Sequence, residues 1–297
     1  MNCPEKTQTY QELLSLKKDF EAAFVNFKSL GGLTHEERKE KVESIKQLII
    51  EIKQKAESFD VWKNKLIKQE KEALLKYFGK AIDVPPIPAE ITKEKMEFWK
   101  QNQFELHYSP GIEIKQTDNF PGQKKKLYDN FYNWIAESKI SPDTNKLPTG
   151  WFLIDTRPKP QYDNGDQMFT NDILAPVLEE LRKDGLIKNY KKTGSRFNVS
   201  HDELNILEVK NAFAKALRVK AEHIDLPPAA IYNYLGNAFY PVWGETNTWE
   251  WFKEKFKRGF RLSGGRSDGG GLSDVGCGSS GYRGGYLGFR LLVRFSV

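Results

Sequence analysis

The chain has 297 residues, of which 39% are hydrophobic, and its 46 Lys and Arg face 40 Asp and Glu. This length predicts two domains at roughly 150 residues each, and the hydrophobic fraction excludes a disordered chain. The net charge of +6 is mild for the length. It does not by itself indicate nucleic-acid binding, which requires basic residues concentrated on one face.

The number and spacing of the cysteines and the hydropathy of the sequence further limit the possible classes of protein. Cys3 and Cys277 lie at opposite ends of the sequence and have no metal-ligand or redox spacing. The first residues lack the apolar run of a signal peptide, and no stretch has the ~20 apolar residues of a membrane span. The four histidines are dispersed, and the calcium-ligand residue types at Asp163–Asp166 are explained equally well by a turn. We therefore expect a cytoplasmic protein without a metal or cofactor.

The first 80 residues predict two helices. Apolar residues recur at three- and four-residue spacing between Tyr10 and Phe27, and Gly31-Gly32 ends that helix. Thr34 and Glu37 form a capping-box pattern that begins a second helix, which continues to about Phe78. We expect the two to form an antiparallel hairpin, through which the chain could bind a partner or self-associate.

Shorter elements follow the hairpin. Val84–Pro88 predicts a linker, and helices are predicted at Lys93–Gln103 and Gly122–Ser138. Turn residues between Ser141 and Gly150 indicate a domain boundary. We accordingly predict a helical domain over 1–146 and a second domain over 147–297, giving an α+β protein.

The second domain opens and closes with apolar stretches. Trp151–Ile154 predicts a buried strand, and Leu287–Val297 predicts another. Helices are predicted between them at Asn171–Lys183 and from Ser200, where Glu203 completes a second capping box. The two strands could pair and close the domain.

Twelve of the 23 glycines lie between Gly259 and Gly288, separated mainly by Ser, Asp, Arg and Tyr. Regularly placed apolar residues interrupt this segment, which predicts tight anchored loops rather than a flexible linker. A phosphate-binding loop is disfavoured because Leu272, not Lys, follows the last glycine of the Gly269–Gly271 run. The arginines do not repeat as RGG units, but their aromatic neighbours keep nucleic-acid binding as an alternative.

Four segments of the second domain together resemble variable proteins of diversity-generating retroelements, of the archaeal or uncultivated-bacterial type. They are YPVWGETNTWEWF at 240–252, RLxGG at 261–265, GGLxxV at 270–275 and GFRL at 288–291. The resemblance covers about Trp151–Val297 and implies a C-type-lectin fold. In that family a reverse transcriptase copies a template with errors at adenines, and the altered copy replaces the 3′ end of the gene.

This resemblance implies a hypervariable region over about 259–290 that binds a protein or other macromolecular ligand without catalysis. Adenine-rich Asn codons altered in this way yield Ser, Asp, Gly, Tyr, Cys and Arg, and Phe is also reachable. The implied solvent-facing ligand-binding positions are Phe260, Ser263, Arg266, Asp268, Gly276, Cys277, Gly278, Ser280, Tyr282, Arg283 and Tyr286. The residues assigned to the scaffold are Leu262, Leu272, Val275, Phe289 and Leu291. An enzyme of the formylglycine-generating type is an alternative, but it needs a cysteine pair, and Cys277 has no partner within this domain.

Overall fold

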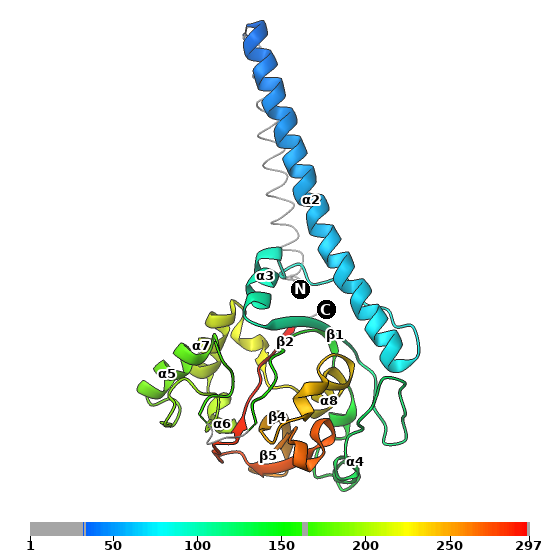
Figure 1. The fold of residues 1–297 in the computed structure, drawn as a ribbon, viewed down its shortest axis with the longest axis vertical. Coiled ribbons are helices and arrows are strands. Elements are labelled where there is room, and N and C mark those ends of the chain that lie inside the picture. The colour runs from blue at the N-terminus through cyan, green and yellow to red at the C-terminus, as the bar shows by residue number, and fades with distance from the viewer. Residues whose placement is uncertain (1–31, 33, 162–165, 296–297) are drawn as a thin grey trace, which may run out of the picture. The chain divides into compact units, whose positions relative to one another are not determined.

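The computed structural model describes residues 32, 34–161 and 166–295, except for the side chains of residues 48, 49 and 51–60. The predicted helix at Tyr10–Phe27 and most of the predicted turn at Asp163–Asp166 lie outside these residues. The chain divides into two compact units. The first contains Met1–Gln69 and Pro85–Glu94, and the second contains Glu70–Val84 and Lys95–Val297 (Figure 1).

The described part of the first unit consists mainly of α2 (His35–Phe78), whose last turns belong to the second unit. The predicted capping box is confirmed at its start. The Thr34 N–H donates to Glu37 Oε2 over 2.8 Å, and the Glu37 N–H donates to Thr34 Oγ1 over 3.4 Å. No helix among the described residues is long and apolar enough to cross a membrane.

The second unit contains a four-stranded sheet in the order β1-β2-β8-β3. Its strands are β1 (Phe104–Pro110), β2 (Thr149–Asp155), β3 (Ile224–Asp225) and β8 (Leu292–Phe295). β1 pairs with β2 along its whole length, from Phe104 opposite Asp155 to Pro110 opposite Thr149. The predicted boundary between residues 146 and 147 therefore separates two strands that are hydrogen-bonded to each other.

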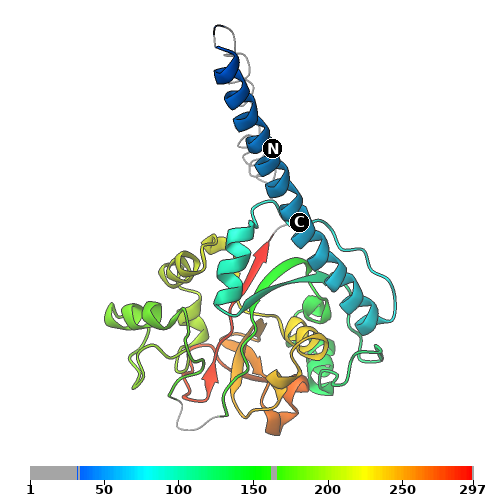
Figure 2. The ribbon, with the colours of Figure 1, turned by 45° about the horizontal axis from the view of Figure 1, so that its top comes forward.

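The expected pairing of the two apolar stretches is confirmed. Trp151 lies opposite Phe295 and Ile154 opposite Leu292, in antiparallel register, so β2 and the C-terminal strand are neighbours (Figure 2). The predicted continuous strand from Leu287 is instead divided, because β7 (Leu287–Gly288) joins a different sheet. Arg290, between β7 and β8, is fully buried among acidic groups.

The second sheet has the order β6-β5-β4-β7. It is formed by β4 (Trp249–Phe256), β5 (Phe260–Gly264), β6 (Val275–Ser279) and β7. The glycine-rich segment, which was expected to form loops, thus supplies β5 and β6, and β7 lies at its end. Helix α8 (Ala229–Ala238) packs against the sheet, where the Tyr232 and Phe252 ring centroids lie 5.2 Å apart.

The remaining helices are short, and several begin later than the sequence predicts. The helix expected at Gly122–Ser138 starts only at Asp129, because the N–H groups of Lys124 and Lys125 donate to Asn237 Oδ1 instead. The other α-helices are α3 (Lys93–Gln101), α4 (Asp129–Ala136), α5 (Ala175–Lys183), α6 (His201–Leu204) and α7 (Leu207–Leu217). Single 3₁₀ turns are η1 (Pro142–Asn145), η2 (Ala221–His223), η3 (Pro241–Gly244), η4 (Ser267–Gly269) and η5 (Gly271–Ser273). The fold is therefore mixed α and β, as predicted.

Candidate ligand-binding face

The register of the second sheet separates two faces. Trp251 of β4, Ser263 of β5 and Gly276 of β6 lie opposite one another, so their side-chain positions share one face. Leu262 and Val275 occupy the alternate positions and are buried. All five predicted scaffold residues are buried: Leu262, Leu272, Val275, Phe289 and Leu291.

An aromatic and cationic cluster forms beside Gly276. The Arg266 guanidinium carbon lies 5.2 Å from the centroid of the Trp249 ring, within the range of a cation–π contact. Tyr286 packs edge-on against Trp249 with a centroid distance of 6.2 Å, and the Tyr282 and Tyr286 hydroxyls are 2.6 Å apart. We call Trp249, Arg266, Gly276, Tyr282 and Tyr286 the aromatic face.

A buried lysine fixes the backbone on both sides of this cluster. Lys159 Nζ donates to the Thr248 carbonyl over 2.8 Å and to the Gly265 carbonyl over 2.6 Å. Trp249 and Arg266 follow directly after these two carbonyl groups. Burial lowers the pKa of Lys159 to about 8. The sequence analysis did not single out this lysine, because its partners lie about 90 and 106 residues away.

The structure brings together only part of the predicted site. Arg266, Gly276, Tyr282 and Tyr286 meet in the aromatic face, and Gly278 lies two residues along β6 on the same face. Phe260 and Asp268 are exposed elsewhere, at the start of β5 and in η4. Trp249, which the sequence analysis did not include among the ligand-binding positions, is the residue around which the others gather.

Two predicted positions are not solvent-facing. Ser263 is buried near the centre of the sheet, between Trp251 of β4 and Gly276 of β6. Ser280 is also buried, because its hydroxyl donates to Asp202 Oδ2 over 2.8 Å and its carbonyl accepts from the Asp202 N–H. Both serines therefore stabilise the scaffold.

Cys277 is half-buried rather than exposed in a loop. It lies opposite Leu262 in β6, so its side chain is on the other face of the sheet from Gly276 and Gly278. Burial raises the pKa of its thiol, despite the opposing effect of Lys139 and Lys257. Cys277 is therefore separated from the aromatic face.

Arg283 also has a structural role. Its Nε–H lies 3.1 and 3.0 Å from the two carboxylate oxygens of Glu203, and its Nη2 donates over 2.9 Å to one of them. The same carboxylate accepts from the Ser200 N–H and hydroxyl, which confirms the second capping box. Arg283 thus attaches the glycine-rich segment to the start of α6, and it lowers the pKa of Glu203 despite the burial of that group.

Beneath the face lies a buried network of charges that sequence reasoning missed. Arg196 Nε donates to Asp172 Oδ2 over 2.6 Å, and its Nη2 donates to Asp155 Oδ2 over 2.8 Å. Arg290 of the GFR element pairs with Glu250, 3.0 Å away, and Arg157 pairs with both aspartates. The sequence did contain one indication of buried charge, because the acidic Glu250 lies between Trp249 and Trp251 in β4.

His201 lies beneath Trp251, with ring centroids 5.8 Å apart. Burial, assisted by Arg261, lowers its pKa to about 4, so the folded protein holds it neutral at pH values where the unfolded chain is protonated. The unfolded state therefore binds more protons between pH 6.5 and about 4, and the stabilising contribution of neutral His201 is lost as the pH falls through this window.

We expect His201→Gln to remove this pH dependence. Between pH 7 and pH 4.5 the wild type should lose about 1 to 3 kcal/mol more unfolding free energy than the variant. Urea unfolding at both pH values measures the difference. Two stability profiles that fall in parallel would contradict a lowered His201 pKa.

No protein-family model, curated protein or solved structure matches this chain. No group of three or more His, Cys, Asp or Glu suited to a metal ion is found among the described residues.

Proposed function

We propose that this chain is a non-enzymatic binding protein whose aromatic face contacts a macromolecular ligand and is diversified by a retroelement. The proposal includes a C-type-lectin fold for the second unit. Its support is the motif resemblance, the presence of two sheets, and the position of β8 between β2 and β3 in the first sheet.

One observation carries the proposal: glycines of the same glycine-rich segment differ in how much space is available for an added side chain. A Cβ added at Gly276 would lie 3.9 Å from the Trp249 ring, and one at Gly278 would lie 3.6 Å from the Trp251 ring, which are ordinary contact distances. A Cβ at Gly264 would instead overlap the Asp274 carbonyl oxygen, and one at Gly271 would stand 2.5 Å from the Gly244 carbonyl oxygen. Side chains can therefore change on the aromatic face without changing the core.

The residue types on this face also suit ligand contact. Tyrosine and arginine combine large contact area with polar groups, and they are enriched among residues that dominate binding energy. Arg266, Gly276, Tyr282 and Tyr286 are all types that an altered Asn codon can encode. Trp249 is the fixed centre around which they would vary.

Sequencing the DNA that flanks the gene tests the diversification. We expect a near-copy of the 3′ end of the gene beside a reverse-transcriptase gene, with differences concentrated at template adenines. The differing codons should include those for Arg266, Gly276, Tyr282 and Tyr286, and the codons for Leu262 and Val275 should be unchanged. The absence of a near-copy, or differences spread equally over face and core codons, would refute the proposal.

A further inference from the structure

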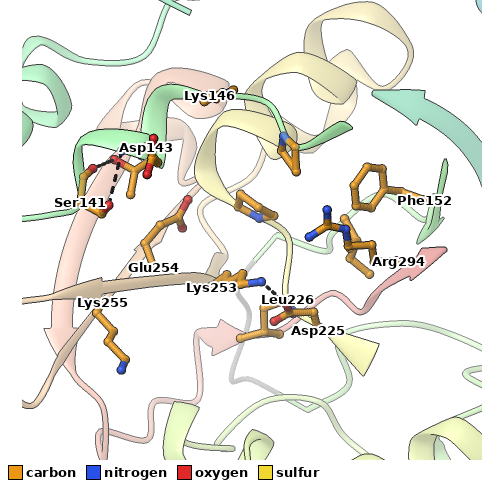
Figure 3. Close-up of a pocket in the computed structure, with 14 residues that line it drawn as sticks. Ser141, Asp143, Lys146, Phe152, Asp225, Leu226, Lys253, Glu254, Lys255 and Arg294 are labelled. Carbon is orange, nitrogen blue, oxygen red and sulfur yellow. Dashed lines mark hydrogen bonds and ion pairs between the residues drawn. The ribbon is translucent and has the colours of Figure 1, made fainter. Parts of the chain in front are cut away.

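Two adjoining pockets lie in the second unit, away from the predicted ligand-binding residues. Their volumes are about 430 and 270 Å³, and both are lined by Asp225, Leu226, Lys253 and Lys255. Figure 3 shows the larger pocket, where β4 carries Lys253 and Lys255 and the end of β8 carries Arg294. We call the two pockets together the basic groove. None of the eleven predicted site residues lines it.

Positive charge dominates the groove. Among the described residues, its lining includes six cationic side chains, Lys146, Lys210, Lys253, Lys255, Arg261 and Arg294. The acidic side chains that line it are Asp143, Asp225 and Glu254. Lys253 forms an ion pair with Asp225, and both residues line both pockets.

The buried acid of the groove carries less than a full negative charge near neutral pH. Glu254 accepts from the Ala229 N–H at the start of α8, at 3.0 and 3.2 Å from its two carboxylate oxygens. Burial raises the pKa of this carboxyl to about 7. Lys146, Lys255 and Arg294 are exposed, and none forms an ion pair with a described residue. Their charge is therefore not neutralised within the part of the chain that the structure describes.

The floor of the groove is apolar. Phe152, Leu226 and Leu292 line the larger pocket, and Leu204, Ile224 and Leu291 line the smaller one. The sizes of the pockets and the combination of an apolar floor with charged walls are typical of small-molecule sites.

We propose that the basic groove binds a small amphipathic organic anion, with its apolar body against the apolar lining and its anionic group attracted by the charges of Lys146, Lys255 and Arg294. Electrostatic attraction to these charges would orient the anionic end. The groove and the aromatic face share no residue, so this proposal does not depend on the diversification of that face.

The fluorescent anion 8-anilinonaphthalene-1-sulfonate is a suitable probe, because it joins an apolar ring system to a sulfonate. We expect the full chain to bind it saturably, with enhanced fluorescence. The double substitution Lys255→Gln with Arg294→Gln should weaken binding about tenfold or more, since it removes two of the positive charges that attract the anion. Both residues are exposed, so the melting temperature should change little.

Two matched variants separate the groove from other surfaces. Lys183→Gln with Arg258→Gln removes the same charges from exposed positions outside the groove, and it should leave the dissociation constant within about twofold. Tyr282→Ser with Tyr286→Ser alters the aromatic face and should likewise leave dye binding unchanged. The neutral dye Nile red should bind more weakly, and its binding should not respond to loss of the groove charges.

Three outcomes would overturn the proposal. The first is that the groove variant binds the anionic dye as tightly as the wild type does. The second is that the matched charge variant loses as much affinity as the groove variant. The third is that Nile red binds as tightly as the anionic dye. Because none of these measurements involves the flanking DNA, failure of the groove proposal and failure of the diversification proposal are distinguishable.

Discussion

Replacing Arg196 with methionine should lower the free energy of unfolding by about 3 to 5 kcal/mol, because it leaves buried acidic groups without their main partner. The Arg196 side chain is fully buried and bonds to both Asp155 and Asp172. Its guanidinium holds the pKa of Asp172 below the usual value although burial acts in the opposite direction. Methionine replaces only the aliphatic stem of arginine and cannot offset the cost of burying those carboxylates.

Urea unfolding at neutral pH measures this loss. Arg258→Met is the matched control, because Arg258 is exposed and its replacement should change stability by about 0.5 kcal/mol or less. Adding Asp172→Asn to Arg196→Met should recover part of the loss, since it removes a buried carboxylate that would keep only Arg157 as its charged partner. Equal stabilities of Arg196→Met and the control would mean that the buried network contributes little.

Gly264→Ser should destabilise the protein by about 3 kcal/mol, whereas Gly276→Ser should change stability by about 0.5 kcal/mol or less. A Cβ at Gly264 would overlap the Asp274 carbonyl oxygen and stand 2.8 Å from the Phe252 ring, and neither group can move freely. At Gly276 the added atom would make only ordinary contacts. The two glycines differ in their surroundings and not in chemistry, so the pair isolates the effect of available space.

Thermal unfolding of the two serine variants and the wild type tests this difference. Gly278→Ser provides a second tolerated position on the same face, because a Cβ there would make an ordinary contact with Trp251. A large loss of stability in Gly276→Ser would show that the aromatic face is part of the core. Full stability of Gly264→Ser would show that the scaffold around β5 can rearrange.

In the second unit, the residues that stabilise the backbone are different from the residues of the aromatic face. Buried charges and tightly packed glycines hold the backbone, and Lys159 fixes the segments that carry Trp249 and Arg266. The proposed diversification requires that residue identity on the aromatic face can change without disturbing this scaffold. A binding surface that is altered between generations requires this separation, because most changes in a packed core cost stability.

Local structural features could be predicted from the sequence. The capping boxes at Thr34 and Ser200 depend on residues three positions apart, and both form as predicted. Trp151–Ile154 forms a buried strand because its apolar residues are contiguous. The scaffold assignment of Leu262 and Val275 is also confirmed, since these apolar residues interrupt an otherwise polar and glycine-rich segment.

The burial of residues that contact distant segments could not be predicted from the sequence. Ser263 and Ser280 have the composition of surface residues, but Trp251 and Asp202 cover them from elsewhere in the chain. Arg283 likewise has a partner about 80 residues away in Glu203. A local pattern predicts helices, strands and burial tendency, because these depend on neighbours along the chain. Which side chains meet, and which therefore face solvent, is decided by long-range packing, and only the tertiary structure places the aromatic face and the basic groove.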